Sequence, residues 1–265
     1  MIPVLSIIVL GFVLGMRHAT DPDHVIAVTA IVSRQSTIRS AMLIGGVWGI
    51  GHTLTIVLVG GAIIVFNVVI PPRLGLSMEL AVAFMLVLLG ILNLTGIMRW
   101  IQGALAPAGE LHSHGHSHGD YVHSHAHGHG AANHGHREDQ TPQAWLDQRL
   151  AWLGLYQTLR PLVVGVVHGL AGSAAVALLV LTAMPNPVWA MVYLLLFGVG
   201  TIAGMMLITA AIGLPFAYTA ARLTRLNRYL GLASGVLSLG FGLFLVYQIG
   251  FVDGLFTSHP RWVPE

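Results

Sequence analysis

The sequence predicts an all-α polytopic membrane protein with about six transmembrane helices, and three observations lead to this fold class. Of the 265 residues, 55% are hydrophobic and only 8% are charged, whereas soluble domains carry roughly 25% charged residues. The mean hydropathy is +0.78. The apolar residues fall into six long runs, and a run of roughly 20 residues can cross the bilayer core as a helix, which satisfies its own backbone there.

The composition also limits the kinds of binding site. Cysteine is absent, so disulfides and thiolate metal sites are excluded. All 12 basic residues are arginine and the net charge is only +2. The high isoelectric point of about 9.3 therefore does not indicate a nucleic-acid partner.

The first apolar segment, residues 2–32, is interrupted by His18-Ala19-Thr20-Asp21-Pro22-Asp23-His24. Neither flanking run reaches the roughly 20 residues that span a bilayer, so both are needed for one crossing. Proline inside a helix removes a backbone donor and clashes with the preceding turn, which predicts a break at Pro22. Broken membrane helices with ionisable side chains are typical of the ion sites of transporters.

The remaining segments divide the chain into two halves around a polar insert. We expect a first three-helix half at 1–98, with its second and third helices at 40–66 and 78–98. An insert at 99–157 separates it from a second half at 158–252 and a short tail at 253–265. The helices of the second half are expected at 159–183, 188–220 and 228–250.

Arginine placement predicts the orientation in the membrane. Most of the arginines lie in the loops after the first, third and fifth segments, including Arg34, Arg39, Arg222, Arg225 and Arg228. Arginine is enriched in cytoplasmic loops. We therefore expect an integral protein of the bacterial cytoplasmic (inner) membrane, with both termini outside and the insert in the cytoplasm.

A faint internal repeat relates the two halves. Residues 15–18, Gly-Met-Arg-His, resemble residues 165–168, Gly-Val-Val-His, and residues 46–51 resemble residues 198–203. Because each unit holds three helices, the second copy would be inverted, giving a 3+3 inverted repeat with a site between the halves. Chance similarity between glycine-rich helices is the alternative. Glycines also recur at four-residue spacing, a pattern that lets membrane helices pack closely.

Four side chains are the main candidates for a metal site: His18, Asp23, His24 and His52. Three imidazoles with a carboxylate suit a borderline divalent cation such as nickel, cobalt, zinc or copper. Magnesium and calcium prefer oxygen ligands. A histidine hydrogen-bonded between helices is the alternative for His52.

Four further residues are candidates for an additional site or for the ion path: Asp21, His168, Ser173 and Met205. Asp21 is either a ligand or the cap of the second half-helix, a role that aspartate fills well. His168 is either a ligand or an interhelical hydrogen-bond partner. The absence of an acidic residue nearby on its own helix favours the hydrogen-bond role. Met205 is either a soft group on the path or a packing residue.

The insert carries a dense histidine tract in which glycine, serine and alanine separate most of the histidines. Its composition cannot build a core, so we expect disorder, and such tracts bind metal ions weakly at many places. A flexible linker or a pH-sensitive segment is the alternative. The ten histidines are His112, His114, His116, His118, His123, His125, His127, His129, His134 and His136.

At these residues the chain resembles the nickel/cobalt transporter family. Residues 18–24 match that family's signature of His, four residues and Asp-His, and Gly51-His52-Thr53 is similar to its Gly-His-Ser/Thr motif. Residues 168–175 and 200–206 look like the branch described as urease or hydrogenase accessory nickel permeases. The resemblance implies a permease that carries Ni²⁺ or Co²⁺ as substrate, without a permanent cofactor, and that uses His18, Asp23, His24 and His52 as its selectivity region.

The leading hypothesis is a secondary permease that imports Ni²⁺ for a nickel enzyme, and the chain is not expected to be an enzyme itself. Efflux of nickel or cobalt, with the histidine tract as a metal antenna, is the second hypothesis. A membrane scaffold that presents the tract to cytoplasmic nickel metallochaperones is the third. An intramembrane metalloenzyme is disfavoured because no His-Glu-x-x-His pair is present. The oligomeric state is left open.

Overall fold

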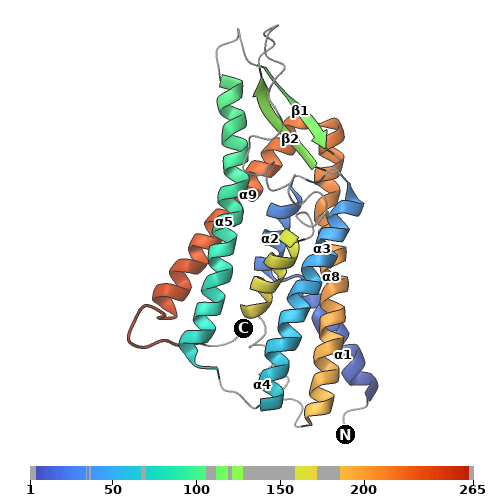
Figure 1. Cartoon of the computed structure of the whole chain (residues 1–265), viewed down its shortest axis with the longest axis vertical. Coiled ribbons are helices and arrows are strands. Elements are labelled where there is room, and N and C mark those ends of the chain that lie inside the picture. The colour runs from blue at the N-terminus through green and yellow to red at the C-terminus, as the bar shows by residue number, and fades with distance from the viewer. Residues whose placement is uncertain are drawn as a thin grey trace.

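A computed structural model describes residues 4–33, 35, 37–66, 70–105, 112–118, 121–127, 159–171 and 186–262. Long helices dominate these residues and lie side by side along the long axis of the molecule (Figure 1). The elements are α1 (Val4–His18), α2 (Pro22–Val32), α3 (Ile38–Thr55), η1 (Ile56–Gly60), α4 (Gly61–Phe66), α5 (Pro72–Leu105), β1 (His112–His118), β2 (Tyr121–His127), the Leu159–Ala171 helix, α8 (Pro187–Arg222), α9 (Thr224–Tyr247) and η3 (Gln248–Val252).

The helical membrane class predicted from the sequence agrees with this architecture. Four continuous helical stretches are long and apolar enough to cross a membrane: Ile38–Phe66, Pro72–Thr95, Pro187–Ala220 and Arg225–Val252. Each overlaps one of the predicted runs. The shorter apolar helices α1, α2 and Leu159–Ala171 lie within the other two predicted segments.

The helix break at Pro22 is confirmed. α1 ends at His18 and α2 begins at Pro22, and Asp21 occupies the N-cap position with an extended backbone. The Asp21 N–H donates to the His18 carbonyl at 3.1 Å, so a single tight turn joins the two half-helices. The Asp21 side chain makes no capping hydrogen bond.

Two pairs of parallel helices pack through glycine. A Cβ atom at Gly200 of α8 would overlap the Phe12 carbonyl of α1, and one at Gly204 would meet Met16 one turn later. In the other pair, the Thr55 hydroxyl of α3 donates to the Val166 carbonyl at 3.2 Å. The close approaches predicted from glycine spacing are therefore present, because a side chain at these positions would push the backbones apart.

Two other pairs are antiparallel and hold the halves together. α3 crosses α8, where Gly49 lies against Ile202 and the Thr53 hydroxyl donates to the Gly198 carbonyl at 3.1 Å. α5 crosses α9, where Gly90 lies against the backbone of Leu239. α3 is thus enclosed between α8 and the Leu159–Ala171 helix.

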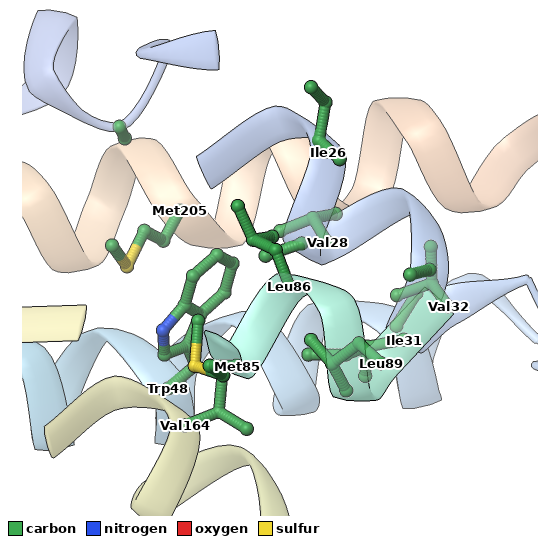
Figure 2. Packing of buried hydrophobic residues seen from close by; sticks show 14 of the residues in the cluster. Ile26, Val28, Ile31, Val32, Trp48, Met85, Leu86, Leu89, Val164 and Met205 are labelled. Atoms are coloured by element: carbon green, nitrogen blue, oxygen red, sulfur yellow. The ribbon is translucent and has the colours of Figure 1, made fainter. Parts of the chain in front are cut away.

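The main apolar core gathers side chains from α2, α3, α5, α8 and the Leu159–Ala171 helix around the indole of Trp48 (Figure 2). Trp48, Leu86 and Val32 are fully buried. Beyond this core the Asn93 amide of α5 donates to the Ser33 and Ser234 hydroxyls at 3.2 and 2.9 Å. This polar contact ties α2 to α5 and α9.

The structure differs from the sequence prediction in the insert. Over the histidine tract we expected no regular structure, but β1 and β2 form an antiparallel hairpin at the end of the bundle where α5 ends (Figure 1). The alternation of histidine with small residues has the two-residue period of a strand, which the composition argument overlooked. α5 also continues to Leu105, beyond the expected start of the insert at residue 99, because no proline interrupts the helical sequence there.

The C-terminal tail folds back on the start of α5. The Trp262 indole donates to the Glu79 carboxylate at 2.8 Å, and the Trp262 ring lies against Gly75. A turn at Gly254, whose φ of +81° favours glycine, directs the chain back. The tail therefore lies at the end of α5 opposite the histidine hairpin.

Candidate metal centre

Three imidazoles meet where the broken helix faces α3. The Nε2 atoms of His18 and His52 are 3.1 Å apart, and one ligand atom each of His18, His24 and His52 lies within 4.8 Å of the others. Two nitrogens bound to one metal ion at about 2.1 Å lie about 3.0–3.4 Å apart in tetrahedral or square arrangements. The spacing of His18 and His52 already fits that range.

Asp23 joins this group to a fourth imidazole. Its Oδ1 accepts from the backbone N–H of His24 at 2.9 Å and lies 2.9 Å from His24 Nδ1. Its Oδ2 lies 2.8 Å from His168 Nε2. The sequence offered no acidic partner for His168, because that partner comes from α2, 145 positions away in the chain.

The site is buried and short of hydrogen-bond partners. His24, His52 and His168 are at most 2% exposed. Within the described part of the chain, His24 Nε2, His52 Nδ1 and His168 Nδ1 have no hydrogen-bond partner. Leaving such groups unsatisfied is costly. A metal ion requires a ring nitrogen with an open lone pair, and the unpartnered His24 Nε2 can supply one.

The helix break explains how His18 and His24 can share a site. They are six residues apart, so one straight helix would point them to different faces. The turn before Pro22 instead brings their rings to a centroid distance of 4.7 Å. The predicted combination of His18, Asp23, His24 and His52 is therefore spatially assembled.

Two aromatic side chains that the sequence analysis did not single out line the cluster. The Trp48 ring stacks on His24 at 5.7 Å between centroids and meets His168 edge-on at 5.6 Å. The Phe197 ring lies 5.4 Å from His18. Trp48 lies one turn before His52 on α3, and Phe197 directly precedes the glycine motif on α8. These positions are the sequence signals that could have identified the two side chains.

The other predicted residues lie in three kinds of place. The Asp21 carboxylate is 45% exposed and lies 2.7 Å from His18 Nδ1, at the more open side of the site. Met205 is buried in the apolar core with Trp48. Ser173, His129, His134 and His136 lie outside the described residues. For the other tract histidines, the structure describes only their positions along β1 and β2.

The comparison with protein families decides the general class. Residues 4–226 match the family model NicO, described as high-affinity nickel-transport protein. The chain belongs to the NicO family. That match includes all the helices that form the histidine cluster.

One curated relative supports the same assignment. The NicO chain is 33% identical over 255 residues to a protein named urease accessory protein UreH from Bacillus sp. (strain TB-90), with 96% of each sequence covered. No solved structure matches the chain. The predicted family resemblance, nickel transport and the non-enzymatic class are confirmed at the family level.

Proposed function

We propose that the protein is a secondary permease that carries Ni²⁺, or Co²⁺, across the membrane through a site built from His18, Asp23, His24 and His52. The observation that carries this proposal is the convergence of three imidazoles and one carboxylate at a helix break inside a helical membrane bundle. Nitrogen-rich sites of this kind suit borderline divalent ions. No permanent cofactor is required, because the ion is the substrate.

The contacts between helices support an inverted repeat as the framework for transport. Gly15 lies against the Phe197 carbonyl and the Thr201 amide, while Gly165 lies against the Trp48 carbonyl and the His52 amide. These contacts are equivalent if residues 12–19 correspond to 162–169 and residues 48–55 to 197–204. This register of the second helix differs by three residues from the sequence match of 46–51 with 198–203. α1 is parallel to α8 and antiparallel to the Leu159–Ala171 helix, as two inverted units require.

We infer import to supply a nickel enzyme as the direction of transport, since the relative's name describes a urease accessory protein. The termini would lie outside the bacterial inner membrane and the hairpin in the cytoplasm, where it could hand ions to nickel metallochaperones. The strand register places histidine opposite histidine three times, at His112 and His127, His114 and His125, and His116 and His123. Paired histidines at the cytoplasmic end would act as an accessory metal-binding segment.

Flux of radioactive Ni²⁺ and Co²⁺ into proteoliposomes tests this proposal. We compare the intact chain with His24→Ala, with deletion of residues 111–136, and with His259→Gln as an exposed histidine outside the cluster. We expect flux to be lost in His24→Ala and kept in the other two variants. Metal bound only through the deleted segment, with no flux from the intact chain, would support the scaffold hypothesis instead.

Efflux is the alternative direction, and whole cells separate it from import. Deleting an importer starves the cell of nickel and lowers the activity of its nickel enzymes, whereas deleting an exporter sensitises the cell to added metal. Increased nickel or cobalt toxicity in the deletion strain would overturn import and leave the transport site itself in place.

A further inference from the structure

We propose that the histidine cluster contains two alternative metal stations that share His24, so that the ion passes from one to the other within the protein. The first station is His18, His24 and His52, and the second is Asp23, His24 and His168. This inference rests on the proposed function. It adds a second station, completed by His168.

Geometry separates the two stations. Ligand atoms of Asp23, His24 and His168 lie within 4.8 Å of one another, as those of the first set do. No described set includes both His18 and His168. The His24 ring lies between them, with its centroid 4.7 Å from that of His18 and 4.1 Å from that of His168.

Each station uses a different ring nitrogen of His24. Nδ1 faces Asp23 at 2.9 Å, whereas Nε2 is buried without a partner among the described residues. With an ion in the first station, Nε2 binds it and the Nδ1–H donates to Asp23, the usual arrangement for a metal-bound histidine. With the ion in the second station, Nδ1 binds it and the proton moves to Nε2.

A neutral imidazole offers one lone pair at a time, so His24 can complete only one station at once. His168 makes the matching exchange: its Nε2 now faces Asp23 at 2.8 Å, and its unpartnered Nδ1 can take the proton when Nε2 binds metal. Both exchanges are tautomer changes that conserve the number of protons. Transfer between the stations therefore requires no net uptake or release of protons.

The proposed correspondence between the halves is consistent with this pairing. His18 and His168 occupy equivalent positions in residues 12–19 and 162–169. Their aromatic neighbours are equivalent too, since Phe197 lies 5.4 Å from His18 and Trp48 lies 5.6 Å from His168. Each half thus supplies one histidine, His18 or His168, and one aromatic side chain that lies against the histidine of the other half. His24, next to the helix break, lies between the two histidines.

Exposure does not separate the two stations, because each has one partly exposed ligand. The His18 side chain of the first station is 16% exposed and the Asp23 side chain of the second station is 31% exposed. The other ligands, His24, His52 and His168, are at most 2% exposed. Each station therefore has one ligand through which an ion can enter or leave.

Binding and flux must be measured on the same purified protein to test the proposal, with residues 111–136 deleted in every variant so that the histidine tract does not bind Co²⁺. His168→Gln keeps a side chain that can donate a hydrogen bond to Asp23 but replaces the ligating imidazole. We expect it to bind Co²⁺ within about threefold of the intact affinity and to lose at least about tenfold in flux. Unchanged flux in His168→Gln would overturn the second station.

A double variant tests the second station directly. His18→Ala with His52→Ala removes the first station, and we expect one weaker Co²⁺ site whose visible spectrum differs from that of the intact protein. Adding Asp23→Asn should abolish that remaining site. Complete loss of binding in the double variant, with normal yield and helix content by circular dichroism, would contradict the proposal.

The controls separate this inference from the proposed function. His259→Gln should match the intact chain in binding and flux. Two Co²⁺ ions bound by the cluster at saturation would contradict mutual exclusion at His24. Absence of flux from the intact chain would overturn the permease, whereas the spectra of the single and double variants would still decide whether two stations exist.

Discussion

At the scale of a single residue, Asp23 connects His24 with His168. Its two carboxylate oxygens face His24 and His168, and one of them also accepts the His24 backbone N–H. Carboxylates that orient metal-binding histidines typically contribute 10–100-fold to metal affinity. Asp23 has this geometry toward His24 in addition to its own proposed role as a ligand.

Asp23→Asn should therefore lower Ni²⁺ affinity by about 10–100-fold, because an amide offers one acceptor where the carboxylate offers two. Isothermal titration of the purified chain, with residues 111–136 deleted so that the histidine tract does not contribute, measures this change. Asp253→Asn, at the end of η3 and far along the chain from the cluster, is the matched control and should bind normally. Equal affinities for the two variants would remove Asp23 from the site.

Most of the site could be predicted from residue types alone. A proline between two aspartates in an apolar run predicted the break, and His18, Asp23, His24 and His52 are brought together there. The Asp23–His168 contact could not be predicted, since it depends on which face of the fourth segment meets α2. Local sequence fixes a helix but leaves the rotation of that helix against distant neighbours undetermined.

At the scale of the elements, the site depends on the close approach of α3 to the Leu159–Ala171 helix. A Cβ atom at Gly165 would overlap the Trp48 carbonyl, directly beside two rings of the cluster. Overpacking of a close contact typically costs about 1–3 kcal/mol. A shift of the Leu159–Ala171 helix that relieves it would also move His168 relative to Asp23.

Gly165→Ala should accordingly lower both the thermal unfolding midpoint and Ni²⁺ affinity. Gly240 in α9 provides the control, since nothing lies within 4 Å of a Cβ atom built there. Because alanine favours a helix over glycine by about 1 kcal/mol, Gly240→Ala should leave the midpoint unchanged or raise it. Thermal melts followed by circular dichroism measure the midpoints of both variants. An unchanged midpoint in Gly165→Ala would show that the two helices can move apart at this contact without a loss of stability.

The element predictions succeeded where hydrophobic runs were long and failed where the pattern was read only as composition. The runs at 40–66, 188–220 and 228–250 match helices, because each must bury apolar length in the bilayer. The histidine tract was judged by its lack of apolar residues, although its alternation suits the β1–β2 hairpin. Backbone pairing can order such a segment without a core.

For the molecule as a whole, the arginines at one end predict the orientation in the membrane. Arg39, Arg222 and Arg225 lie at the termini of α3, α8 and α9, at the same end of the bundle as the hairpin (Figure 1). The tail that packs on the start of α5 lies at the opposite end. The positive-inside rule then predicts that the arginine end lies in the cytoplasm.

Single cysteines can test this orientation directly, since the chain has none of its own. Leu223 at the α8–α9 junction and Ser258 in the tail are both exposed positions. In intact spheroplasts a membrane-impermeant maleimide should label Ser258→Cys, whereas Leu223→Cys should react only after permeabilisation. The reverse pattern would place the histidine hairpin outside the cell. An importer would then meet the hairpin before the buried site, and the hairpin would collect incoming ions instead of receiving those already transported.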